Sequence, residues 1–461
     1  RESLTSMAEY AGLLMFVAAF VFLLLGYPVA ITLAGTALLA AGIGIITGDF
    51  NPALLSATPN RLFGIMTNQT LMAVPLFILM GVILERSKIA ERLLETMSKL
   101  FGHLPGGLGI AVTVVGMLMA ASTGIVGATV VTMGLMALPS MLKANYDPVL
   151  ATGTICATGT LGQIIPPSIA LVLLGDVLGN AYQQAQLNMG IFNPQTVSVG
   201  DLFAGAILPG LCLVTFYLLY IMGTAILSPH RAPPVATAAV TLQEIVYSIL
   251  PPLLLILSVL GSILTGIATP TEAAGVGALG AFILALWSRH VDGPQFMDIG
   301  RSTTRTTAMV FFILVGASLF SLVFRGFGGD ELVQALFAEM PGGVIGATAI
   351  VMLVIFLLGF ILDFIEITFV VIPIVGPILM AMGVDPIWLG IMIAVNLQTS
   401  FLTPPFGFAL FYLRGVAPLS ISTLQIYRGV VPFIMMQILL LVLLTWQPGL
   451  ATWLPSVLFP K

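Results

Sequence analysis

The sequence predicts an all-α membrane protein that crosses the bilayer many times and consists of two copies of one structural unit. Apolar residues make up 59% of the chain and charged residues only 7%, against the roughly 25% charged content of soluble domains. The apolar segments are continuous runs without alternation, and in a bilayer such runs favour helices over a barrel. The 461 residues have room for a dozen or more spans of about 20 residues each.

The duplication is visible as motifs that recur at a nearly constant distance. Asp147-Pro148 and Pro166-Pro167 recur as Asp385-Pro386 and Pro404-Pro405, both displaced by 238 residues. Smaller matches keep the offset between 235 and 240: Gly26 with Gly266, Ala34-Gly35 with Ala274-Gly275, Gly81 with Gly316, Pro105-Gly106-Gly107 with Pro341-Gly342-Gly343, and Pro139 with Pro377. A duplicated and interrupted hydrophobic segment is typical of transporters.

The first copy begins with three predicted spans, at about 10–26, 28–48 and 71–85. The first of them leads into the second without a small-residue cleavage site, so it is a retained span and not a signal peptide. The charged amphipathic stretch 86–101 cannot cross the bilayer, and we expect it at the membrane surface.

A hairpin and a broken helix follow in the first copy. The apolar runs 107–120 and 129–142 flank a polar interruption at 121–124, and each run is too short to span comfortably, which predicts a re-entrant hairpin. The segment 148–179 is long enough to span, but Pro166-Pro167 in its middle removes helix donors and clashes with the preceding turn. A helix broken inside the bilayer is the expected result.

The second copy repeats this layout. It has a hairpin at 343–382, with polar tip residues from Asp363 to Thr368, and a broken span at 386–416 that is interrupted between Asn396 and Gly407. The remaining predicted spans lie at about 202–227, 246–266, 271–287, 307–324 and 430–447.

The distribution of Lys and Arg gives an orientation, because basic residues collect on the cytoplasmic side. With each hairpin returning to its own side, one face holds 11 basic residues and the other 4, namely Arg1, Arg61, Arg325 and Lys461. The richer face is assigned to the cytoplasm. The first hairpin then enters from the cytoplasm and the second from outside, so the repeats are inverted, and both termini lie on the periplasmic side.

Unwound backbone deep in a membrane is tolerated only where it lines a cavity or binds something. Freed carbonyl oxygens can ligate a hard cation such as sodium, and half-helix N-termini direct positive ends towards an anion. Hydroxyl groups near the interruptions can complete the oxygen shell: Ser122, Thr160, Ser168, Ser400 and Thr403. This pattern predicts sodium-coupled uptake of an organic anion.

Four segments carry a resemblance to a known family: Gly162-Gln-Ile-Ile-Pro-Pro-Ser168, Ala268-Thr-Pro-Thr-Glu-Ala-Ala274, Gly359-Phe-Ile-Leu-Asp363 and Thr403-Pro-Pro-Phe-Gly407. In this order and spacing they resemble the large membrane subunit (M subunit) of tripartite ATP-independent periplasmic (TRAP) transporters. The resemblance covers essentially Met7 to Lys461. It implies an elevator-type ion transporter of the bacterial or archaeal inner membrane, in which a mobile domain slides against a scaffold.

The resemblance also implies partners. They are a small four-helix membrane subunit, a periplasmic substrate-binding protein and a small organic anion, with Na⁺ as the coupling ion and no cofactor or nucleic acid.

The resemblance further implies how the chain divides into scaffold and mobile segments. Residues 1–6 are expected to be a linker or expression remnant, 7–101 scaffold helices and a surface arm, and 102–180 the first hairpin and broken helix. Residues 181–340 are expected to be connecting and scaffold helices with a second surface arm, 341–417 the second hairpin and broken helix, and 418–461 a final scaffold helix and the C-terminus.

The family motifs locate two sodium sites. The first joins the first tip to the first break and uses Ser122, Thr123, Gly124, Gly162, Ile165 and Ser168. Adding 238 to the last three positions gives Ser400, Thr403 and Phe406, so the second site relies on backbone carbonyls, together with Asp363. The alternative for Ser122 and Ser168 is hydrogen bonding within a helix.

The substrate is expected to contact Asp363, Glu366, Thr129, Asn396, Gln398 and Thr399. An acid at the depth of Asp363 is functional by default in a membrane helix, with sodium or a substrate hydroxyl as its partner; the alternative is a cap on the outgoing half-helix. Glu366 either selects substrate or faces the outer water. The variant tip and the polar insert 180–200 resemble the branch that handles 2-oxoacids or other small carboxylates, such as C4-dicarboxylates, more than the sialic acid branch.

Other function classes remain as alternatives. A binding-protein-independent anion carrier or exchanger would use the same fold, and a channel would need a continuous polar pore. An intramembrane enzyme needs a nucleophile with its base, but His103, His230 and His290 all lie in predicted loops, and we assign no catalytic residue.

Glu272 is expected to stabilise a helix start. The segments 49–69 and 180–200 are expected to be outer loops that meet the binding protein.

Overall fold

The computed structural model describes residues 8–461, and within them the chain is helical and contains no strand. The expected role of residues 1–6 lies outside the described residues. The helices of the first half are α2 (Ala11–Leu24), α3 (Val29–Thr47), η1 (Pro52–Ala57), α4 (Thr58–Met66), η2 (Thr70–Met72), α5 (Ala73–Arg86), α6 (Ile89–Phe101), α7 (Gly107–Thr123), α8 (Val126–Lys143), α9 (Pro148–Thr160), η3 (Leu161–Gln163), α10 (Ile169–Asn188) and α11 (Val199–Leu227).

The second half follows in the same order. Its helices are α12 (Leu242–Leu264), α13 (Pro270–Ser288), α14 (Gly293–Gly326), α15 (Gly329–Ala338), α16 (Gly343–Leu358), α17 (Phe364–Val370), α18 (Ile372–Ala381), α19 (Pro386–Leu402), α20 (Phe408–Val416), α21 (Thr423–Trp446) and α22 (Gly449–Leu458). Seven helices in the described part are long and apolar enough to cross a membrane, and up to nine spans result if each of two bent helix pairs counts as one.

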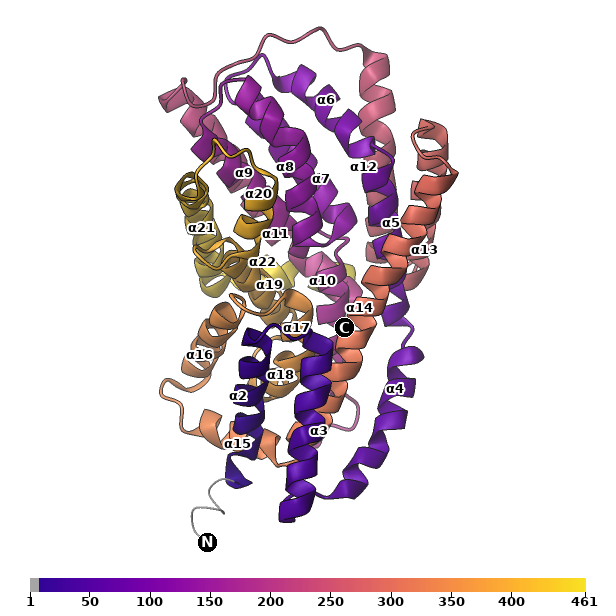
Figure 1. The fold of residues 1–461 in the computed structure, drawn as a ribbon, viewed down its shortest axis with the longest axis vertical. Helices are drawn as coiled ribbons and strands as arrows, with labels where there is room; N and C mark the ends of the chain where they lie inside the picture. Colours follow the sequence, from indigo (N-terminus) through magenta and orange to yellow (C-terminus); the bar gives the residue numbers. More distant parts are fainter. Residues whose placement is uncertain (1–7) are drawn as a thin grey trace.

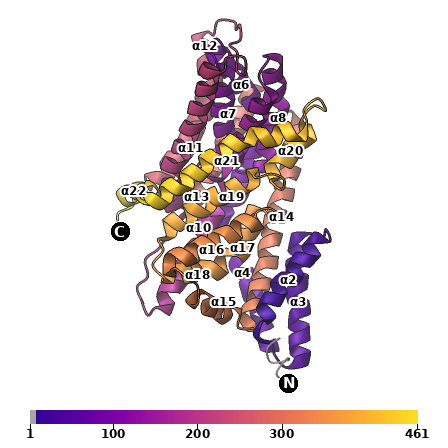
Figure 2. The ribbon, with the colours of Figure 1, turned by 90° about the vertical axis from the view of Figure 1, so that its left-hand side faces the viewer.

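Equivalent helices of the two halves occupy equivalent places. α3 packs against α14, and their counterparts α13 and α5 pack against each other. In the same way α10 packs against α18, and their counterparts α20 and α8 pack against each other. The hairpin α7–α8 lies in the upper part of the molecule and the hairpin α16–α18 in the lower part, in both views (Figures 1 and 2). The two hairpins therefore enter the fold from opposite ends.

The recurring Asp-Pro motif has the same role in both halves. Asp147 Oδ1 accepts a hydrogen bond from Val149 N (3.1 Å) at the start of α9, and Asp385 Oδ1 accepts one from Ile387 N (2.9 Å) at the start of α19. Each aspartate is an N-cap followed by a proline at the first helical position, which lacks the amide that a helix start leaves unpaired. The motif thus fixes where each broken helix begins.

Glycines allow two helices to cross at very short range. A Cβ atom at Gly153 of α9 would lie 2.0 Å from the Gly429 carbonyl oxygen of α21, and one at Gly429 would lie 2.2 Å from Val149 O. Small residues at a crossing are typical of membrane helices that associate tightly. α11 joins the same group, because the fully buried Tyr217 accepts a hydrogen bond from Gln437 Nε2 (2.7 Å) and packs edge-on against Phe433 of α21 (5.0 Å).

Several sequence expectations are wrong in detail. The expected outer loop 49–69 is mostly helical: η1 and α4 form a helix that is bent by 56° against α5. The polar insert 180–200 begins inside α10, which continues to Asn188. α14 starts at Gly293, well before the expected span at 307, and α22 has no counterpart among the expected elements, whereas α15 lies within the segment where a second surface arm is expected. The expected spans are identified from long apolar runs, and short helices with polar flanks have no such run.

Candidate functional site

The first hairpin tip touches the first helix break. α7 ends at Thr123 and is capped by Gly124, whose φ of +64° favours glycine; a Cβ at Gly124 would lie 3.0 Å from Ile169 N, at the start of α10. A Cβ at Gly162, in the break, would lie 3.2 Å from Ala120 O of α7. The structure therefore brings together the tip and the break that the sequence pairs as a sodium site.

The hydroxyl groups of this first site are partly engaged by the backbone. Ser122 Oγ donates to Met119 O (2.9 Å) inside α7, and Thr123 Oγ1 lies 2.6 Å from Thr129 Oγ1 across the tip. Ser168 Oγ donates to Gly162 O (2.8 Å) and accepts from Leu171 N (3.4 Å), so it closes the break and caps α10. Ser122 makes the bond within a helix that the alternative interpretation describes, whereas Ser168 bonds across the break instead.

The Ile165 side chain points away from the tip. A Cβ at Gly210 of α11 would lie 2.8 Å from Ile165 Cδ1, so this side chain packs towards α11. Because an isoleucine side chain has no ligand atom, only the backbone of Ile165 could contact a cation.

The second tip meets the second break in the equivalent way. A Cβ at Gly359 would lie 2.4 Å from Ser400 Oγ, and Ser400 Oγ donates to Phe356 O of α16 (2.7 Å). The rings of Phe360 and Phe406 are 5.4 Å apart, with Phe406 52% exposed. Thr403 Oγ1 donates back to Thr399 O (2.8 Å). Gly162 and Ser400, which are 238 residues apart, each lie against their own tip.

A direct contact joins the two broken helices at equivalent positions. Gln398 Nε2 donates to Thr160 Oγ1 (3.4 Å), and the two residues are separated by the repeat offset of 238. Both are fully buried. A residue that contacts its own counterpart lies close to the axis relating two repeats, so this pair marks the centre of the duplicated fold.

Three buried side-chain oxygens near the breaks and the second hairpin have no hydrogen-bond partner within the described protein. They are Gln163 Oε1, Thr368 Oγ1 and Gln398 Oε1. A buried acceptor without a partner costs about 1–3 kcal/mol unless water or an ion satisfies it. Neutral oxygens of this kind suit a hard monovalent cation.

Asp363 begins α17. Its carboxylate accepts from Phe364 N (2.7 Å), and Glu366 Oε2 accepts from Asp363 N (2.9 Å), which makes a capping box. Asp363 itself is exposed, whereas Glu366 is only 8% exposed and does not face water. The cap that the sequence offers as the alternative for Asp363 is present, and its charge is still accessible to a ligand.

Two further expected substrate contacts are directed into the protein. Asn396 Nδ2 donates to Met352 O of α16 (2.8 Å), and Thr399 Oγ1 donates to Val395 O (2.8 Å). The Asn396 bond holds α19 against the second hairpin, whereas the Thr399 bond lies within α19 itself. Glu272, in contrast, has the structural role expected for it, because Glu272 and Thr269 form a capping box at the start of α13.

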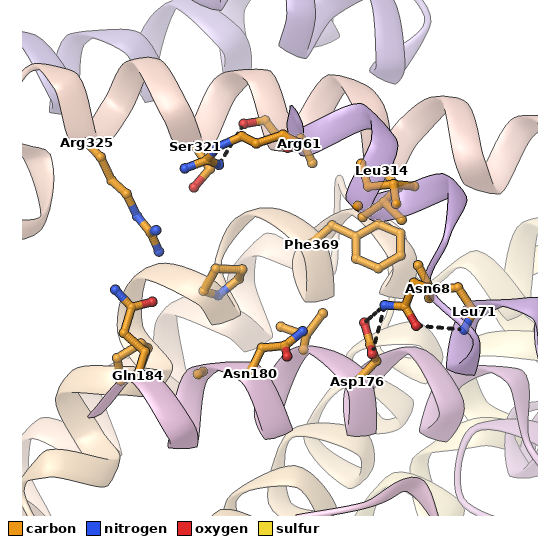
Figure 3. A pocket seen from close by; sticks show the side chains of 18 residues that line it. Arg61, Asn68, Leu71, Asp176, Asn180, Gln184, Leu314, Ser321, Arg325 and Phe369 are labelled. Atoms are coloured by element: carbon orange, nitrogen blue, oxygen red, sulfur yellow. Dashed lines mark hydrogen bonds between the residues drawn. The ribbon is translucent and has the colours of Figure 1, made fainter. Parts of the chain in front are cut away.

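A cavity of about 340 Å³ lies between α4, α10 and α14, and it is not among the features expected from the sequence. Arg61 and Arg325 line it on one side and Asn180 and Gln184 on the other (Figure 3). Asn68, in the bend between α4 and α5, donates to both carboxylate oxygens of Asp176 on α10 (3.1 and 3.2 Å). One signal was available: Arg61 and Arg325 are two of the four basic residues on the face that is poor in them.

The paired hairpins and broken helices define the architecture of a membrane transporter. The solved structure of the YdaH transporter of Alcanivorax borkumensis has the same fold, with a TM-score of 0.60, 15% identity, and coverage of 86% of this chain and 89% of that one.

The family model described as "Tripartite ATP-independent periplasmic transporter, DctM component" matches residues 16–450. The C4-dicarboxylate TRAP transporter large permease protein DctM of Vibrio cholerae is 30% identical over 96% of this chain and 97% of its own length. The sialic acid TRAP transporter large permease SiaM of Vibrio cholerae is 27% identical over 88% of this chain and 91% of its own length, and the ectoine/5-hydroxyectoine permease UehC of Ruegeria pomeroyi is 28% identical over 97% and 99%.

This chain belongs to the DctM family of TRAP transporters and is a large permease subunit, not an enzyme.

Proposed function

We propose that this permease subunit imports a small organic acid, coupled to sodium, after a periplasmic substrate-binding protein has delivered it. The observation that carries the proposal is the contact of each hairpin tip with its own helix break, Gly124 with Ile169 and Gly359 with Ser400. Each contact brings a backbone carbonyl oxygen of the tip against the break, Ala120 O against Gly162 in the first half and Phe356 O against Ser400 in the second, and oxygen ligands of this type bind sodium. Asp363 remains the candidate contact for the substrate or its cation.

The proposed motion is an elevator movement. Both hairpins and both broken helices form the mobile unit, and α2–α5 and α12–α14 form the scaffold. The packing supports adding α11 and α21 to the mobile unit, in place of the scaffold role expected from the sequence, because the Gly153–Gly429 crossing leaves no room for sliding between α9 and α21. The small membrane subunit would then bind the scaffold.

The class of substrate is the less specific part of the proposal. Among the relatives, the printed substrates are C4-dicarboxylates, sialic acid, ectoines and isethionate. All are small molecules with a carboxylate or sulfonate group. The exposed carboxylate of Asp363 and the buried Glu366 favour a small, hydroxylated or cation-paired acid. We propose a 2-oxoacid or a C4-dicarboxylate, and an orientation in the inner membrane with both termini on the periplasmic side.

Uptake into proteoliposomes tests this function. The chain would be reconstituted with its small membrane subunit and supplied with labelled 2-oxoacids, C4-dicarboxylates and sialic acid, with and without an inward sodium gradient and the matching binding protein. We expect uptake of a small carboxylate only when both are present. Uptake that does not require the binding protein would support the autonomous carrier instead. Uptake that does not depend on the sodium gradient would rule out sodium as the coupling ion.

The Asn68–Asp176 contact joins the proposed scaffold to the proposed mobile unit, so movement must break it. Asn68→Ala is expected to lower the population of the observed arrangement by roughly tenfold, since two hydrogen bonds to a carboxylate contribute about 1.5–3 kcal/mol or more. The measurement is the distance distribution between spin labels at Leu279→Cys on α13 and Leu439→Cys on α21, both exposed positions. Asn188→Ala, at the exposed end of α10, should leave the distribution unchanged.

A further inference from the structure

The cavity between α4, α10 and α14 contains two basic side chains in a chain with only 7% charged residues. Arg61 Nη1 donates to Ser318 O (3.3 Å), and Arg61 forms no ion pair with any described residue. Arg325 Nε lies 3.1 Å from Asp330 Oδ2 at the start of α15. Two arginines thus share one acid at this end of the cavity.

The other wall adds amides and one carboxylate that is already bound. Asn180 and Gln184 are exposed on α10, and Figure 3 shows the Arg325 side chain extending towards Gln184. Asp176 lies at the far end of the cavity, where Asn68 satisfies both its oxygens. An arriving ligand therefore meets an unpaired guanidinium, a second one with spare donors, and amide groups.

We propose that Arg61 and Arg325 form a binding site for the carboxylate or sulfonate group of a small organic anion, separate from the hairpin tips. Arginine binds such groups through two parallel N–H donors, and a cavity of about 340 Å³ is within the range for small ligands. α4 and α14 belong to the proposed scaffold, whereas α10, α17 and α18 belong to the proposed mobile unit. The site holds the anion between the two units before it reaches the tips.

The inference deepens the proposed function, because its occupant is the transported acid. The binding it describes does not require transport, so it is tested on the purified chain in detergent. The probes are succinate and isethionate, and the measurement is their Kd from the shift in thermal unfolding. Arg61→Gln should weaken binding about tenfold or more, the usual effect of removing a hydrogen bond between charged groups. Arg325→Gln should act in the same direction, and Arg61→Lys should retain part of the affinity.

The matched control is Arg305→Gln, which removes an exposed arginine from α14 that forms no ion pair with a described residue. It should bind both probes as the native chain does. A second measurement keeps both arginines. In a Cys212→Ala background, Gln184→Cys introduces a thiol into the wall of the cavity. This thiol should react more slowly with a thiol reagent when succinate or isethionate is present, because the anion covers it.

The site is overturned if neither probe binds the native chain, if Arg61→Gln and Arg305→Gln bind equally well, or if the Gln184→Cys thiol is unprotected. Stabilisation by phosphatidylglycerol but by neither soluble anion would assign the arginines to a lipid headgroup and also overturn it. These results are separable from those on the proposed function. Normal uptake by Arg61→Gln would rule out the arginine site and leave the proposed transport function standing. Anion binding without sodium-dependent uptake would support the arginine site and rule out the proposed sodium coupling.

Discussion

Asp363→Asn is expected to reduce sodium-dependent uptake about tenfold or more without changing thermal stability. Asparagine is as good an N-cap as aspartate, so α17 keeps its start and the Phe364 amide keeps an acceptor. What the substitution removes is the exposed negative charge, and a hydrogen bond or ion contact made by a charged group contributes about 1.5–3 kcal/mol. Initial uptake rates and the unfolding midpoint of the purified variant measure the two effects separately.

Asp292→Asn is the matched control, since Asp292 also caps a helix through a capping box but lies at the exposed start of α14. It should leave both uptake and stability unchanged. If Asp363→Asn transported normally, Asp363 would be only a cap and would leave the candidate site. If it lost stability, the cap and the charge would be inseparable, and the proposed role in binding would lose its support.

Gly359→Val is expected to abolish sodium-dependent uptake and to lower the stability of the fold. Its Cβ would lie 2.4 Å from Ser400 Oγ and 2.8 Å from Ser400 Cβ, so the second tip must move away from the second break. Overpacking of this kind typically costs about 1–3 kcal/mol. The measurements are uptake as a function of sodium concentration and the unfolding midpoint.

Gly223→Val on α11 provides the control, because a Cβ there would meet nothing within 4 Å. It should preserve uptake. The double variant Gly359→Ala with Ser400→Gly places at 400 the residue that occupies the equivalent position 162, and it should recover much of the stability by relieving the contact. Full sodium-dependent uptake by Gly359→Val would mean that the tip and the break need not touch for the ion to bind.

The arrangement of the two copies could be predicted because the sequence marks it with residues of strong backbone preference. Pro166-Pro167 and Pro404-Pro405 interrupt the broken helices, and Asp147 and Asp385 start them, as the structure confirms. Prolines and N-caps act through local physics, so a pattern along the chain is sufficient to place them.

Features that depend on contacts between distant elements could not be predicted. The cavity takes Arg61 from α4, Asp176 from α10 and Arg325 from α14, and no spacing along the chain links these positions. The attachment of α21 to α9 depends on Gly153 meeting Gly429, which looks like any other pair of membrane glycines in the sequence. The orientation of the Ile165 side chain towards α11 is likewise a packing result that no pattern along the chain predicts.

The most direct test of the account is whether α21 moves with α8 and against α13. Spin labels at Leu135→Cys and Leu439→Cys report on the proposed mobile unit, and labels at Leu279→Cys and Leu439→Cys report across its boundary with the scaffold; all three positions are exposed. Distances would be measured in bilayers, without sodium, with sodium, and with sodium and substrate. We predict an unchanged distance for the first pair and a second, distinct distance for the other pair when sodium and substrate are added. A change in the first pair, or one fixed distance for both pairs under all conditions, would contradict a mobile unit built from these helices.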